Sequence, residues 1–182
     1  MAKAEYAALL ANVPEPFEKG SSAHLAKKYL TARRNLLSVV IFTTINLFLL
    51  LLDGSTYMLF SASIPYYLPA FAKAVDDILM EGHYLTWGAY GISMASILFY
   101  LLCWHFGKER RGWMIAALVM FALDCLGLIG LVVLTQTSVD FILDIVFHIW
   151  VMYYLVSAAR SSSKLNRLLA EADAAPASPE FD

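Results

Sequence analysis

Residues 113–158 read WMIAALVMFALDCLGLIGLVVLTQTSVDFILDIVFHIWVMYYLVSA, and this stretch decides the fold. It contains two apolar runs, Trp113–Thr135 and Phe141–Ala158. Each run is close to the ~20 residues that an α-helix needs to cross the hydrocarbon core of a bilayer. Helix is the expected state, because the backbone must satisfy its own hydrogen bonds in lipid. The connection of residues 136–140 is so short that the two helices must pack as an antiparallel hairpin.

Two more apolar runs of similar length precede this hairpin, at Asn35–Leu52 and Tyr84–Phe106. The whole chain is 60% hydrophobic and 15% charged, with a mean hydropathy of +0.63. Soluble domains are nearer half apolar and a quarter charged. The sequence therefore predicts an all-α integral membrane four-helix bundle. The polar first 34 residues hold no signal-peptide pattern, so we expect the first run to remain as an uncleaved anchor.

Basic residues predict how the four spans are oriented. Of 13 Lys and Arg, six precede the first span, three lie between the second and third, and three follow the fourth. Only Lys73 falls on the other side. The positive-inside bias then places both termini in the cytoplasm. We divide the chain into an N-terminal helical segment (1–34), a four-span domain (35–160) and a tail (161–182) that is disordered from Ala170 onward.

The connection between the first and second spans has an unusual composition. Residues 56–72 read TYMLFSASIPYYLPAFA, an apolar and aromatic stretch interrupted by Pro65 and Pro69. Proline removes a backbone donor and favours a kink or break. We expect a broken or re-entrant segment at the outer surface, with a simple aromatic belt as the alternative. Residues 73–82 then predict a separate short amphipathic helix.

Ionisable and polar side chains recur at mid-depth in the predicted spans. Asp124 lies near the middle of one helix of the hairpin, and Asp144 and His148 lie one turn apart on the other. Charged groups in lipid are costly and usually face a partner or a cavity. Together with Asn46 and Ser93 from the first two spans, they predict a ligand- or ion-binding centre inside the bundle. The competing interpretation is purely structural, because a buried Asp–His pair can hold two helices together.

A metal site is a further hypothesis for this centre. Asp144 and His148 have the i, i+4 spacing that lets two side chains reach one ion, and Asp124 would be the third ligand. The chain has no H-E-x-x-H motif and no second histidine on either helix. We therefore predict no cofactor, and a divalent metal at this centre stays the less favoured alternative. The two cysteines, Cys103 and Cys125, lie inside apolar runs and are expected to be buried thiols.

The expected partners follow from charge and from small residues. The net charge is −2 and no basic stripe alternates with aromatic residues, which argues against nucleic-acid binding. The lipid bilayer is the predicted environment. Gly91 and Ala95 form a small-xxx-small pair, which allows close helix approach. This pair predicts packing within the bundle or, as the alternative, a homo-oligomer through this face.

Three strings resemble those of a bacterial family of small four-span membrane proteins with no assigned activity. They are residues 32–46 (ARRNLLSVVIFTTIN), 59–67 (LFSASIPYY) and 144–155 (DIVFHIWVMYYL). The resemblance implies a multi-pass protein of the bacterial cytoplasmic membrane. It implies no catalytic or binding residue.

Three functional hypotheses remain open from the sequence. The favoured one is ion, proton or small-molecule transport or binding through the polar mid-membrane site, since His148 can change charge near neutral pH. The second is a binding or assembly protein without chemistry, motivated by the lack of a strong motif. The third, least favoured, is a metal-assisted membrane enzyme acting on a lipid-like substrate.

Overall fold

The computed structural model describes residues 8, 18–52, 61–79, 82–108, 110–135 and 142–174. Its main elements are five helices: α2 (Ser22–Leu51), α3 (Ile64–Leu79), α4 (Tyr84–Phe106), α5 (Arg111–Thr135) and α6 (Ile142–Ala174). Within these ranges the regular structure is helical throughout. Four helices, all except α3, are long and apolar enough to cross a membrane. The all-α class and the four candidate spans are therefore confirmed.

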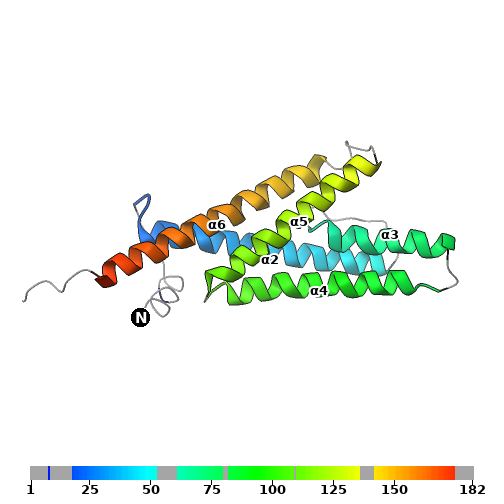
Figure 1. Cartoon of the computed structure of the whole chain (residues 1–182), viewed down its shortest axis with the longest axis horizontal. Helices are drawn as coiled ribbons and strands as arrows, with labels where there is room; N and C mark the ends of the chain where they lie inside the picture. Colours follow the sequence, from blue (N-terminus) through cyan, green and yellow to red (C-terminus); the bar gives the residue numbers. More distant parts are fainter. Residues whose placement is uncertain are drawn as a thin grey trace, which may run out of the picture.

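The helices pack side by side along one long axis (Figure 1). α2 packs against α6 and α4, α5 pairs with α6 as the predicted hairpin, and α3 lies along α4. The start of α2 and the end of α6 lie at the same end of the molecule, whereas α3 lies toward the opposite end (Figure 1). The short α3 therefore extends only part of the way along the bundle.

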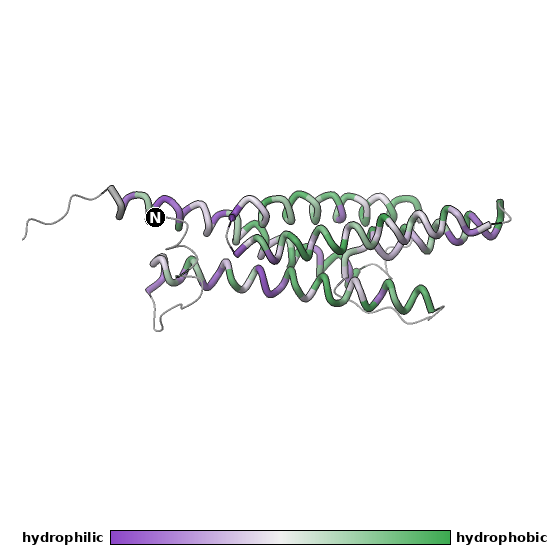
Figure 2. Tube along the Cα trace, turned by 90° about the horizontal axis from the view of Figure 1, so that it is seen from below, coloured by the Kyte–Doolittle hydropathy of each residue, from purple (hydrophilic) through white to green (hydrophobic). Residues whose placement is uncertain are grey.

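Apolar side chains cover both the inside and the outside of this bundle. The core includes Tyr29, Leu36, Phe121 and Val151, all at most 1% exposed. Large apolar side chains also face outward along the four long helices, including Phe48, Ile92, Leu126, Val133 and Ile149. In Figure 2 the hydrophilic residues gather on the start of α2 and the end of α6, beyond the apolar middle. An apolar surface of this extent suits a lipid environment, so the structure supports a multi-pass membrane protein.

The first and last spans are longer than the sequence runs suggest. α2 begins at Ser22, and the Ser21 hydroxyl accepts a hydrogen bond from the His24 amide at 3.2 Å, which caps the helix. The expected boundary at residue 34 therefore lies inside a continuous helix. α6 continues to Ala174, so the expectation of disorder from Ala170 was wrong for residues 170–174. Residues 175–182 lie outside the described residues.

The segment between the first two spans also differs from the expectation. α3 is a single helix that contains Pro69, so the predicted break at this proline and the separate helix over 73–82 were both wrong. Pro65 lies in the first turn, where a helix needs no amide donor. Pro69 then removes only the bond to the Pro65 carbonyl, and the packing of α3 on α4 supports the rest. Residues 56–60 of the predicted segment lie outside the described residues.

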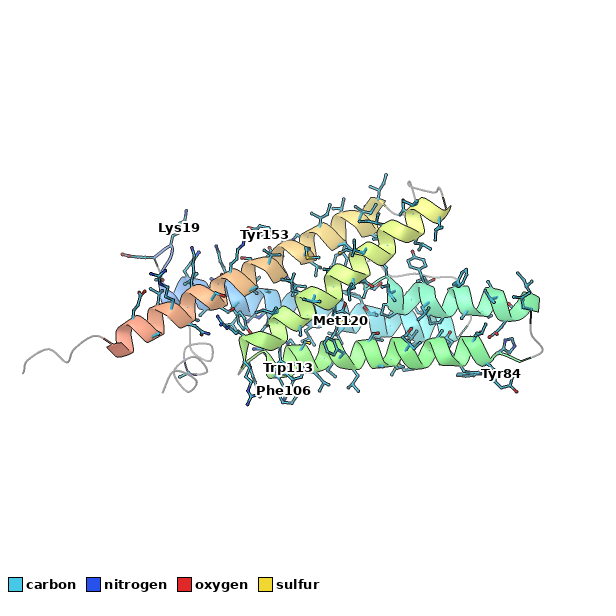
Figure 3. All side chains as sticks on the ribbon, in the orientation of Figure 1. Lys19, Tyr84, Phe106, Trp113, Met120 and Tyr153 are labelled. Atoms are coloured by element: carbon cyan, nitrogen blue, oxygen red, sulfur yellow. The ribbon has the colours of Figure 1, made fainter. Side chains whose placement is uncertain are left out.

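The C-terminal end of α4 is anchored by α2. The Arg33 guanidinium donates two hydrogen bonds to the Trp104 carbonyl, at 2.8 and 3.3 Å. The Tyr29 hydroxyl donates to the carbonyl of Gly107, the C-cap residue, at 2.6 Å. A cation at this position also complements the helix dipole. Figure 3 labels Phe106 and Trp113 where α4 turns into α5, with ring centroids 5.2 Å apart.

Candidate functional site

The α5–α6 hairpin brings an aspartate and a histidine into direct contact. The His148 Nε2 atom lies 2.8 Å from the Asp124 Oδ2 atom, and both side chains are 3% exposed. Asp124 lies near the middle of α5, and His148 lies two turns into α6. The short connection between the helices predicts this approach, and the structure shows it.

Asp124 also holds the first residues of α3. Its Oδ2 atom accepts a hydrogen bond from the Ser63 amide at 2.9 Å, and its Oδ1 atom accepts one from the Ile64 amide at 2.7 Å. The Ser63 carbonyl accepts the first helical hydrogen bonds, from Tyr66 and Tyr67. Ser63 is therefore the N-cap position, and Asp124 caps α3 from another helix. A carboxylate is favoured there because the N-terminal end of a helix carries partial positive charge.

The residues just before α3 are held by α2. The Ala62 amide donates a hydrogen bond to the Thr43 hydroxyl at 2.8 Å, and the Asn46 side-chain amide donates to the Ser61 hydroxyl at 2.8 Å. Three consecutive amides, from residues 62 to 64, thus bond to side chains of α2 and α5. Unpaired backbone groups are very costly away from water, so these side chains provide what a buried helix start requires.

The contacts of His148 determine how many protons the pair holds. Its Nδ1 atom lies 2.7 Å from the Asp144 carbonyl oxygen, which only accepts, so Nδ1 carries a hydrogen. Its Nε2 atom faces Asp124 Oδ2 and, at 3.3 Å, the Ser63 hydroxyl. A lone pair on Nε2 would repel an ionised carboxylate, so one proton must lie between these atoms. The pair is therefore net neutral, either as imidazolium and carboxylate or as imidazole and carboxylic acid.

Aromatic and small residues complete the surroundings. The Phe121 ring stacks on the His148 ring, with centroids 5.0 Å apart and an interplanar angle of 19°. Gly127, one turn beyond Asp124, allows α3 to approach α5. A Cβ atom at this glycine would lie 2.8 Å from the Ile64 side chain. A mostly apolar groove of about 190 Å³ runs between α3 and α5 and includes Ser63 in its wall.

The five predicted site residues differ in how they take part in this network. Asp124, His148 and Asn46 converge on residues 61–64. Asp144 is 2% exposed and supplies its carbonyl oxygen to His148. Ser93 is fully buried on α4, but its hydroxyl has no hydrogen-bond partner among the described residues, so it lies outside the network.

Sequence reasoning did not identify the other half of the site. Ser61, Ser63 and the three amides of residues 62–64 were expected in an outer-surface segment, not against Asp124. The local signal is the string Ser61-Ala-Ser-Ile-Pro65, in which serine followed by proline is typical of a helix start. That string indicates where α3 begins but contains no information on which side chain caps it.

The hypothesis of a three-ligand metal site gains no support from this geometry. In the described ranges, no three His, Cys, Asp or Glu side chains are grouped so that they could hold an ion. Asp124, Asp144 and His148 therefore do not form the predicted ligand set. Both carboxylate oxygens of Asp124 are instead used by amides and by the imidazole.

Comparison of the chain with protein-family models, with curated proteins and with solved structures gives no match.

Proposed function

We propose that this multi-pass membrane protein binds and releases protons at the Asp124–His148 pair and couples this to the docking of α3. The observation that carries the proposal is that one carboxylate makes two kinds of contact. The same carboxylate contacts the imidazole at 2.8 Å and caps the first amides of α3 at 2.7 and 2.9 Å. Any change in its protonation therefore acts on both contacts.

The depth of the pair supports a role in moving ions or protons. In the proposed topology α3 is a re-entrant half-helix that begins at mid-membrane depth and leads back to the outer surface. Half-helices whose N-terminal ends face the membrane centre are typical of ion and substrate sites in transporters. Both termini would lie in the cytoplasm, and the bacterial inner membrane is the proposed location.

The proton balance links either change in protonation, gain or loss of one proton, to the docking of α3. Adding one proton leaves a carboxylic acid beside an imidazolium, which weakens the hydrogen bonds that Asp124 accepts from the amides of Ser63 and Ile64. Removing one proton places the Nε2 lone pair against a carboxylate, which drives α5 and α6 apart. The net-neutral pair is therefore the state in which α3 docks best, and both changes favour its release.

Proton flux in liposomes tests the transport form of this proposal. The chain is reconstituted with an internal pH dye, a pH gradient is imposed, and potassium with valinomycin sets the potential. We expect the wild type to dissipate the gradient faster than Asp124→Asn and His148→Gln. Asp77→Asn is the matched control, because Asp77 is an exposed aspartate outside the network. Circular dichroism in the same detergent establishes that each variant is folded.

Imidazole NMR tests proton binding without requiring flux. A variant with His24, His83 and His105 replaced by Gln leaves His148 as the only histidine, and its ring nitrogens are followed between pH 4 and pH 10. We expect a pH-dependent change that disappears on adding Asp124→Asn. An unchanging ring spectrum, together with equal flux in all variants, would contradict the proposal.

A non-catalytic assembly protein is the second candidate. It is favoured by the closed state of the centre, where the amides of residues 62–64 and both oxygens of Asp124 already have protein partners. Gly91 and Ala95 are exposed on α4, and nothing lies within 4 Å of a Cβ atom built at Gly91. This face is the proposed contact between copies. If Asp124→Asn changes stability or association but neither flux nor imidazole titration, this candidate replaces the first.

A further inference from the structure

The polar end of the bundle contains a hollow where α2, α5 and α6 meet. It has a volume of about 680 Å³ and lies between Leu25 and Lys28 of α2, Ile115 of α5 and one face of α6. The α6 face contributes Arg160 and Lys164, which are one turn apart, and the hydroxyls of Ser157 and Ser161. Three cationic side chains from two helices thus border one concave surface.

These cations are available for a ligand. Lys28, Arg160 and Lys164 are all exposed, and none has a carboxylate within 4.0 Å in the part of the chain that the structure describes. By contrast, Arg167 on the next turn of α6 pairs with Glu171 at 2.7 Å. Like charges gathered around one hollow repel each other, and an anion between them relieves this repulsion.

Most of the remaining lining is apolar or aromatic. Tyr153, Val156 and Ile115 line the hollow and belong to the helices α6 and α5, two of the candidate spans. Figure 3 labels Tyr153 on α6, and Figure 2 shows the polar part of α6 beginning beyond the apolar stretch. A tyrosine at such a boundary is typical of headgroup depth. The hollow thus offers cations to a headgroup and apolar side chains to the first part of an acyl chain.

A second hollow of about 370 Å³ adjoins the first. It shares Lys28, Tyr153 and Ser157 and adds His24 and Lys27 of α2. The basic surface is therefore continuous along the groove between α2 and α6. Basic pockets between spans, on the side where Lys and Arg gather, are the sites that bind phosphate headgroups of anionic lipids.

We propose that this hollow, bordered by Lys28, Arg160 and Lys164, binds the phosphate headgroup of an anionic phospholipid. The serine hydroxyls add donors to the phosphate oxygens, and the acyl chains extend along the apolar side of the hollow. This site is distinct from the Asp124–His148 pair, because the parts of α2 and α6 that line it lie at the end of the bundle opposite α3 (Figure 1).

Native mass spectrometry of the full chain tests the proposal. The protein is extracted from vesicles of equal phosphatidylglycerol and phosphatidylcholine, and the retained lipid adducts are counted. We expect the wild type to retain phosphatidylglycerol preferentially. In the triple variant Lys28→Gln, Arg160→Gln, Lys164→Gln we expect the ratio of retained phosphatidylglycerol to phosphatidylcholine to fall at least about tenfold. Each cation near an anionic headgroup raises the affinity for it roughly fivefold.

The matched control removes the same charge from the same end of the bundle. Lys19→Gln, Lys108→Gln, Arg110→Gln changes three exposed cations outside both hollows. We expect it to keep the wild-type preference within about twofold. Equal loss in both triple variants, or no wild-type preference for phosphatidylglycerol, would overturn the site. If excess inorganic phosphate alone displaces the lipid, the ligand of this site is free phosphate and not a phospholipid headgroup.

Discussion

Two aspartates in this chain cap the N-terminal ends of two successive helices, α3 and α4. Asp124 caps α3 from α5, and Asp76 of α3 caps α4. The Asp76 Oδ2 atom accepts hydrogen bonds from the amide and the hydroxyl of Thr86, both at 2.7 Å, in the first turn of α4. Each carboxylate thus satisfies donors that a helix start leaves unpaired, and each links two elements.

The environment of Asp76 shifts the pKa of its carboxyl. Burial by itself raises this pKa. The hydrogen bonds from the start of α4, above all those from Thr86, together lower it by more than burial raises it. The net pKa therefore lies below the usual value. A lowered pKa in the folded state means that the ionised form stabilises the fold. This stabilisation is present above the pKa of the unfolded chain and is lost as the pH falls through the folded value.

We expect the melting temperature of the wild type in detergent to fall as the pH is lowered below about 4, the ordinary pKa of an aspartate. Asp76→Asn should melt lower than the wild type at neutral pH, because a neutral amide caps α4 less well. The two proteins should then converge as the pH decreases. Thermal unfolding followed by circular dichroism from pH 3 to pH 7 measures this difference.

Asp77→Asn is the control for this titration. Asp77 is the exposed neighbour of Asp76 and lies 3.9 Å from His83, so it reports the general effect of losing one charge at this end. We expect its melting curve to follow that of the wild type at every pH. A constant gap between the wild type and Asp76→Asn, with no convergence in acid, would show that Asp76 does not titrate as described.

At the scale of elements, α3 is the unusual component. It is too short to span a membrane, and its first residues bond to α2 and α5. Gly127 is what allows Ile64 to reach Asp124, because a Cβ atom there would overlap the Ile64 side chain at 2.8 Å. Gly127 therefore has a role inside the molecule, in the packing of α3 against α5.

Gly127→Ala tests how closely α3 must approach α5. Relative to Gly130→Ala, we expect it to lower the free energy of unfolding by about 1–2 kcal/mol, the usual cost of overpacking. Gly130 is the matched control, since it lies on the same helix and a Cβ atom there meets nothing within 4 Å. Reversible unfolding in mixed micelles measures both variants.

A second substitution makes this prediction specific. Adding Ile64→Ala to Gly127→Ala removes the overlapping side chain and should restore part of the lost stability. Ile64→Ala alone should cost little, because Ile64 is 37% exposed. If the double variant is no more stable than the additive sum of its two single changes, the contact between α3 and α5 is not what Gly127 protects.

At the scale of the whole molecule, the structure places the start of α2 and the end of α6 together and α3 at the other end (Figure 1). With Cys103 and Cys125 replaced by Ala, single cysteines at Lys19, Ser163 and Asp77 test the proposed topology. We expect an impermeant maleimide to label Asp77→Cys in intact cells. Lys19→Cys and Ser163→Cys should react only after lysis, because positive charge retains that end inside.

Equal labelling of all three positions in intact cells would contradict the orientation. Labelling of Lys19→Cys and Ser163→Cys from opposite sides would contradict the arrangement of the helices. Lysed cells, in which all three exposed positions must react, show that the cysteines are reactive.

Much of the architecture could be predicted from local pattern. α4 has the same bounds as its apolar run, and α5 begins only two residues before its own. The meeting of Asp124 and His148 also followed from sequence, because a short connection between two helices leaves one antiparallel arrangement. The extension of α2 and α6 beyond the apolar runs did not, since polar residues outside lipid allow helix and coil alike.

The sequence by itself determined the four candidate spans, the helical hairpin and the places of Asp124 and His148 along it, because these follow from length, apolarity and helical periodicity. Only the tertiary structure decided that Asp124 caps α3, that Thr43 and Asn46 hold the residues before it, and that Ser93 lies apart. The physical reason is that a buried amide can donate its hydrogen bond to any well-placed oxygen. Which oxygen reaches it depends on how distant helices pack, and no local pattern encodes that. The amides of Ser63 and Ile64 lie 61 and 60 residues from Asp124 in the chain.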